Sequence, residues 1–175
     1  MYLVNTRPEF CYVVNTLSQG MVEPKRAHWA AAKHVLRYLP GTINYGLLYT
    51  RGKDIILSGF TDVDWEGSSV DRKSTSGYYF NIGSGMTSWC SKKLKSVALS
   101  SAEVEYMSAR TASCEAIWLR KLLVNLFRRK MEATRIMCDN WSCIKLSHNP
   151  VFHDRSKRID IRCHFVRDCV QRGAV

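Results

Sequence analysis

Three acidic residues stand where metal-dependent phosphodiester chemistry would need them. Asp62 in GFTDVDW and Asp139 in IMCDN each follow an apolar run typical of a strand, and Glu105 in LSSAEVEY lies one turn into a predicted helix. Carboxylates are hard oxygen ligands suited to Mg²⁺ or Mn²⁺, and two such ions about 4 Å apart can stabilise the attacking and leaving oxygens of a displacement at phosphorus. We therefore interpret the three residues as candidate metal ligands.

Two further acids lie close to these in the sequence. Glu103 is the third residue after Ser100, where its carboxylate can return to the cap backbone, so we assign it to a capping box and keep Glu105 for metal. Asp64 follows Asp62 by two residues and therefore faces the same side of a strand, as a possible accessory acid. For any single acid, a solvated position at the end of a strand or helix is the simpler interpretation. The combination of three favours a metal site.

An α/β fold is predicted from the elements that must position these acids. Segments rich in β-branched and aromatic residues predict antiparallel strands at residues 46–50, 54–65, 77–83 and 86–92. Helical periodicity and caps predict helices at residues 100–127, 141–147 and 159–172, with a strand at 134–138 before the second of them. Before all of these, residues 7–39 have a helical pattern that is interrupted at 20–24 and stopped by Pro40-Gly41, which predicts a helical hairpin.

The composition favours a polyanionic partner. Lys and Arg number 26 against 15 Asp and Glu, a net charge of +11, and nucleic acid is the simplest partner for such a surface. No apolar run approaches the roughly 20 residues of a membrane-spanning helix, and the N-terminus does not resemble a signal peptide, so we expect an intracellular chain without a membrane partner. The seven cysteines form no compact framework and are predicted to be reduced.

Basic and hydroxyl residues in three segments are candidates for sequence-independent contact with phosphates. The set comprises Arg72, Lys73, Ser74, Thr75, Ser76, Lys92, Lys93, Arg155, Lys157 and Arg158.

Many consecutive segments, in order, resemble the ribonuclease H end of copia-type retrotransposon Pol polyproteins. They are RPEFCYVVNTLSQGM, HWAAAKHVLRYLPGT, GFTDVDWEG, DRKSTSGYYF, SWCSKKLKSVALSSAEVEY, EAIWLRKLL and CDNWSCIKLSHNPVFHDRSKRIDIRCHFVRD. The resemblance covers nearly the whole chain. It implies that residues 1–45 correspond to the C-terminal tail of reverse transcriptase, and residues 46–175 to a ribonuclease H-like domain.

The resemblance implies metal-dependent endonucleolytic hydrolysis of RNA in RNA/DNA hybrids. Carried over by motif, Asp62 is the first-strand acid, Glu105 the helix acid and Asp139 the fourth-strand acid, which together would hold two Mg²⁺ or Mn²⁺ ions. No small-molecule cofactor is implied. The expected partners are the hybrid and the upstream reverse transcriptase portion of the polyprotein. The expected location is the cytoplasm, virus-like particles or the nucleus.

The sequence departs from the family pattern at its C-terminus. The family continues with another strand and a helix that bear a fourth acid, and this sequence ends at Val175 before them. We therefore expect a truncated domain that lacks an edge strand and one ligand. This keeps open an alternative from another class, a catalytically incomplete nucleic-acid-binding remnant of the polyprotein.

A zinc-binding structural protein is a third interpretation. Cys138, Cys143, His148 and His153 recur every five residues. Structural zinc sites favour closer cysteine pairs, and a strand followed by a helix would separate these four side chains. Packed thiols and exposed imidazoles explain them better.

Overall fold

The computed structural model describes residues 2–51, 54–64, 73–98, 100–128, 130–148 and 160–175, with residues 160–164 described by their backbone only. Its elements are α1 (Tyr2–Thr6), the 3₁₀ helix η1 (Pro8–Phe10), α2 (Cys11–Gln19), α3 (Arg26–Gly41), β1 (Leu57–Asp64), β2 (Thr75–Ile82), β3 (Gly85–Lys93), α4 (Ser101–Phe127), β4 (Arg135–Met137), α5 (Trp141–His148) and α6 (Asp160–Gln171). No helix among these residues is long and apolar enough to cross a membrane.

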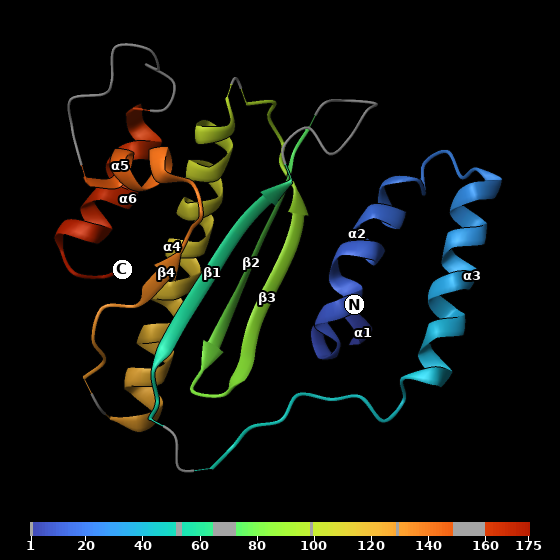
Figure 1. Cartoon of the computed structure of the whole chain (residues 1–175), viewed down its shortest axis with the longest axis horizontal. Helices are drawn as coiled ribbons and strands as arrows, with labels where there is room; N and C mark the ends of the chain where they lie inside the picture. The colour runs from blue at the N-terminus through green and yellow to red at the C-terminus, as the bar shows by residue number, and fades with distance from the viewer. Residues whose placement is uncertain (1, 52–53, 65–72, 99, 129, 149–159) are drawn as a thin grey trace.

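The four strands form one mixed sheet in the order β3-β2-β1-β4, which confirms the predicted α/β class with packed helices. β1, β2 and β3 are a meander of antiparallel neighbours, whereas β4 returns after α4 and pairs with β1 in parallel. Such a parallel return needs a crossover connection, and α4 supplies it. Figure 1 shows α4 running behind the sheet, with α5 and α6 beside it.

The long helix α4 begins and packs as its sequence predicts. The side chain of Ser100 accepts a hydrogen bond from the backbone N–H of Glu103, 3.2 Å away, which confirms the N-cap. The predicted apolar stripe is buried: Tyr106 and Ala109 pack with Cys143 of α5 and Val166 of α6, and the rest packs on the sheet, namely Ala112, Ala116, Leu119 and Leu123. The centre of the core forms where this stripe meets Leu57 of β1 and the fully buried Phe80 of β2.

A buried hydroxyl cluster joins α4 to the sheet near its polar end. The Oγ of Ser108 lies 2.6 Å from Thr61 Oγ1 of β1 and 2.7 Å from Ser76 Oγ of β2. All three side chains are buried, so each hydroxyl depends on the others for its hydrogen bonds. These hydrogen bonds fix the position of α4 along the direction of β1 and β2.

The N-terminal helices lie beside β3, at the sheet edge opposite β4 (Figure 1). The indole Nε1 of Trp89 donates to the carbonyl of Val4 over 2.8 Å, and Lys93 Nζ donates to Gln19 Oε1 over the same distance. α3 follows after a turn and has no buried residue. Its Trp29 and Leu36 side chains are 64% and 60% exposed, so an amphipathic surface remains open there.

The predicted strand at residues 46–50 is wrong, because this segment forms no ladder in the structure. It passes the turn between β2 and β3 and attaches there through side chains. The backbone N–H of Thr50 donates to Ser84 Oγ over 2.8 Å, and the hydroxyl of Tyr49 donates to the carbonyl of Met86. Its apolar residues produced the strand pattern, yet Leu48 is 82% exposed.

Candidate metal centre

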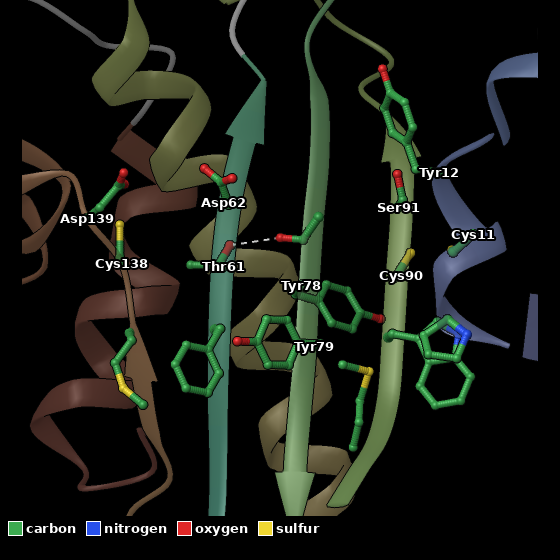
Figure 2. Close-up of a pocket in the computed structure, with 16 residues that line it drawn as sticks. Cys11, Tyr12, Thr61, Asp62, Tyr78, Tyr79, Cys90, Ser91, Cys138 and Asp139 are labelled. Carbon is green, nitrogen blue, oxygen red and sulfur yellow. Dashed lines mark hydrogen bonds between the residues drawn. The ribbon is translucent and has the colours of Figure 1, made fainter. Parts of the chain in front are cut away.

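The register of β1 and β4 brings two of the predicted acids to the same end of the sheet. The last paired residues are Phe60 of β1 and Met137 of β4, in parallel strands. Asp62, still within β1, and Asp139, two residues past the end of β4, therefore lie at the same end of the sheet. Figure 2 shows the two carboxylates at this end of the sheet, and both line the same depression.

Glu105 reaches this end from the first turns of α4. Its side chain is only 8% exposed, and its carboxylate lies with Cys138 and Asp139 in a group whose ligand atoms are all within 4.8 Å of one another. Burial is the main cause that raises the pKa of Glu105, to about 7, and the negative charges of Cys138, Asp139 and Asp62 add to it. The three predicted acids therefore act on one another electrostatically.

Cys138 is the member of this cluster that the sequence interpretation missed. Its Sγ lies 3.9 Å from Glu105 Oε2. A hydrogen bond from the Cys143 thiol and another from the backbone N–H of Asn140 lower the pKa of Cys138 to about 7, against the opposing effect of burial. The available signal was its place directly before Asp139 at the end of a strand. The sequence pattern includes it only in the five-residue Cys and His spacing.

The loop after β4 is held by the start of α5. Asn140 Oδ1 accepts from the backbone N–H of Cys143 over 3.0 Å, as an N-cap residue does, and the Asn140 carbonyl accepts from Ile144 N–H. This fixes the backbone that presents Cys138 and Asp139. The position of both side chains thus depends on a local cap.

A broad depression on the sheet face opposite α4 adjoins the acids. Its volume is about 660 Å³, and it extends from Asp62 and Asp139 toward the N-terminal helices. The rings of Phe60 and Tyr79 stack across β1 and β2 with centroids 4.6 Å apart, and Met86 and Trp89 line its far part. The site therefore opens onto an aromatic surface wide enough for an extended partner.

The structure places only part of the predicted phosphate-contact set. Lys92 is exposed, whereas Ser74 and Ser76 are buried at 3% and 7% exposure, and the Ser76 hydroxyl faces α4, where it bonds to Ser108. Lys73 and Thr75 are half-buried, and Lys93 donates to Gln19. The remaining candidates lie outside the described residues, namely Arg72, Arg155, Lys157 and Arg158.

In the described part of the chain, the Cys and His residues that recur every five positions do not come together as a set of zinc ligands. There, the group able to hold a metal ion is Glu105, Cys138 and Asp139, which shares only Cys138 with that spacing. His148 is exposed at the end of α5, and His153 lies outside the described residues.

Comparison with known proteins identifies the relatives of this chain. It is 44% identical over 174 residues to the retrovirus-related Pol polyprotein from transposon RE2 of Arabidopsis thaliana, a match that covers 99% of this chain and 12% of that protein. It is 42% identical over 168 residues to the corresponding polyprotein from transposon TNT 1-94 of Nicotiana tabacum, with 96% and 12% covered. It is also 50% identical over 120 residues to the secreted RxLR effector protein 161 of Plasmopara viticola, which covers 68% of this chain and 84% of that protein.

No protein-family model and no solved structure matches the chain. The chain spans 12% of the length of the Pol polyproteins that it resembles, but these cover almost all of it. The chain belongs to the retrovirus-related Pol polyproteins of copia-type retrotransposons and corresponds to one segment of them.

Proposed function

We propose that this segment is a ribonuclease H-like nuclease that hydrolyses the RNA strand of RNA/DNA hybrids with divalent metal. The observation that supports it is that Glu105 of α4 and Asp139 after β4 lie within 4.8 Å of one another, with Asp62 of β1 outside that group but close enough for its charge to raise the pKa of Glu105. These acids are far apart in sequence, and nothing in the core requires three carboxylates at one end of the sheet. Like charges in one place destabilise a fold unless a cation compensates them.

The residues fit a hard divalent cation. Oxygen ligands from two or three carboxylates suit Mg²⁺ or Mn²⁺, and Glu105 is a buried carboxylate whose recorded hydrogen bond, within the described residues, comes from a weak thiol donor. Asp62, Glu105 and Asp139 would hold the metal, which when bound would polarise the phosphate and favour ionisation of the attacking water. The cap at Asn140 orients Asp139.

The shape and charge around the acids suit a duplex. Asp64 pairs with Thr75 of β2, and Thr75 pairs with Lys93 of β3, so Lys73, Lys92 and Lys93 lie at the same end of the sheet as the acids. Cationic side chains at this end offer contact to phosphates without selecting a base sequence. A nuclease that recognises duplex shape needs this kind of surface.

The test is cleavage of a hybrid labelled on its RNA strand, in Mg²⁺, by the chain and by Asp62→Asn and Asp139→Asn variants. Asp54→Asn is the matched control, because Asp54 is an exposed acid ahead of β1, away from the site. We expect each site variant to lose more than about 100-fold in rate, since even residues behind metal ligands contribute about 10- to 100-fold. The control should retain the rate.

A nucleic-acid-binding remnant is the second candidate, favoured by the net charge of +11. A chain extended by the residues that follow in a related Pol polyprotein separates the two. Cleavage by either form, lost in Asp62→Asn, supports the nuclease. Hybrid binding without cleavage by both forms would refute the nuclease and leave the binding function.

A further inference from the structure

The sulfur of Cys138 changes what the acidic site can bind. Its Sγ lies 3.9 Å from a carboxylate oxygen of Glu105, and the ligand atoms of Glu105, Cys138 and Asp139 all lie within 4.8 Å of one another. Figure 2 shows the sulfur of Cys138 beside the Asp139 carboxylate, at the same end of the sheet as Asp62. The cluster therefore has one soft ligand between hard ones.

These distances suit a small four-coordinate ion. Bonds of about 2.0 to 2.3 Å to oxygen and sulfur in a tetrahedral site place neighbouring ligand atoms about 3.5 Å apart. The Cys138 and Glu105 atoms are within a few tenths of an ångström of that separation. Three protein ligands would leave a fourth position for water, as in open zinc sites.

The burial of Glu105 and its weak hydrogen-bond donor are a second observation that points to a bound cation. Glu105 as a residue is 8% exposed, and among the described residues the hydrogen bond to its carboxylate comes from the Cys138 thiol. A buried carboxylate normally has a cationic or N–H partner, because its desolvation is costly. An ion bound between Glu105 and Cys138 would replace this weak donor.

The surroundings of Cys138 are organised as those of a metal ligand are. The Cys143 thiol and the Asn140 backbone N–H both donate to its sulfur, and Asn140 in turn caps α5. Such outer contacts orient a ligand and are typical of sites that hold metal tightly. A cysteine that only filled the core would need none of them.

We propose that Glu105, Cys138 and Asp139 form a binding site for a thiophilic divalent cation such as Zn²⁺ or Cd²⁺, which competes with Mg²⁺ for the same carboxylates. Mg²⁺ prefers six oxygen ligands and gains nothing from sulfur, whereas Zn²⁺ and Cd²⁺ bind thiolate strongly. Binding releases the thiol proton to the buffer and involves no oxidation. The consequence that such an ion inhibits hydrolysis rests on the proposed nuclease function, but the binding itself does not.

The binding test uses the full chain, reduced and freed of metal, without nucleic acid. Cd²⁺ is added and the ultraviolet sulfur-to-cadmium charge-transfer band is recorded, for the wild type and for Cys138→Ser, Glu105→Gln and Cys114→Ser. Cys114 is an exposed thiol on α4 and serves as the matched control. We expect one equivalent to bind in the wild type and the control, and Cys138→Ser to lose the band with a fall in affinity of about 100-fold or more.

Glu105→Gln should keep a band but bind at least about tenfold more weakly, because a ligand of the same ion is lost. Circular dichroism confirms that each variant is folded. A wild type without the band, or a band of undiminished affinity in folded Cys138→Ser, would overturn the proposal. In the hydrolysis assay, Zn²⁺ should inhibit the wild type and not Cys138→Ser at equal Mg²⁺. Absence of hydrolysis by both the chain and its extended form would refute the proposed function and leave the spectroscopic result intact.

Discussion

Replacing Glu105 with Gln should stabilise the metal-free protein, and by an amount that grows with pH. The pKa of this carboxyl is about 7 in the folded protein, against an ordinary value of 4.5, mainly because it is buried. The folded state therefore retains the proton while the unfolded chain has already released it. As pH rises from 4.5 to 7, the wild type loses stability, and the loss stays complete above pH 7.

The size of the effect follows from the difference in pKa. One unit corresponds to 1.36 kcal/mol, so a shift from 4.5 to about 7 makes the wild type less stable by about 3 kcal/mol at high pH. Between pH 5 and pH 8 the change is about 2 to 3 kcal/mol by the same relation. Glutamine has a similar shape and does not ionise, so Glu105→Gln escapes this loss.

The assay is urea unfolding at pH 5 and pH 8 in a chelator, followed by circular dichroism. Titrating groups away from Glu105 are common to both proteins and cancel when the free energies of unfolding are subtracted, whereas the neighbouring Cys138 thiol, with its pKa lowered to about 7, also contributes in this range. Glu103→Gln is the matched control, since Glu103 lies two residues before Glu105 on α4 and Gln can also occupy that capping position. We expect the advantage of Glu105→Gln over the wild type to grow by about 2 to 3 kcal/mol from pH 5 to pH 8, beyond any change seen with Glu103→Gln.

An equal advantage at both pH values would refute the reasoning, because it would mean that Glu105 ionises in the folded protein as it does in the unfolded chain. Adding Mn²⁺ at pH 8 provides a second check. A bound cation compensates the carboxylate, so it should stabilise the wild type and have little effect on Glu105→Gln.

Three further changes test the packing beneath the site by urea unfolding. Gly59→Ala should lower the free energy of unfolding by about 1 to 3 kcal/mol, because an added Cβ would lie 2.4 Å from the buried Phe80 ring. Gly77→Ala should cost less, since the nearest atom to its added Cβ is 3.7 Å away. Equal losses of stability in the two variants would show that the Phe80 ring moves aside. Ser108→Ala should cost about 1 to 3 kcal/mol, because it leaves two buried hydroxyls on β1 and β2 without their shared partner; a neutral result would mean that water replaces it. Ser100→Ala should cost about 1 kcal/mol through loss of the α4 cap, and an unchanged midpoint would contradict that role.

Local patterns predicted the elements that depend on local physics. The cap at Ser100 and the apolar stripe of α4 follow from side chains within one helix, so the sequence is sufficient for them. Asp62 and Asp139 were predicted as neighbours because each follows an apolar run, and two such runs meet in a sheet. The strand predicted at residues 46–50 failed because an apolar segment can lie on the surface when side chains at a turn, here Tyr49 and Thr50, attach it.

The role of Cys138 could not be predicted in the same way. Its importance depends on Glu105 from α4 and on Cys143 from α5, and neither distance can be read from the spacing of residues along the chain. The five-residue repeat even directed attention to His148, which lies outside the cluster. Contacts that join three elements appear only when the elements are packed.

The pairing of β4 determines which atom is presented at the site. β4 has only three paired residues, from Arg135 to Met137, and its alignment with β1 rests on them. A slip of one residue would shift Cys138 and Asp139 relative to Asp62 of β1, so that a different side-chain atom would face Glu105. The choice between oxygen and sulfur at this position thus depends on a three-residue alignment, and mutations in β4 that replace no ligand could change which metal ions the protein tolerates.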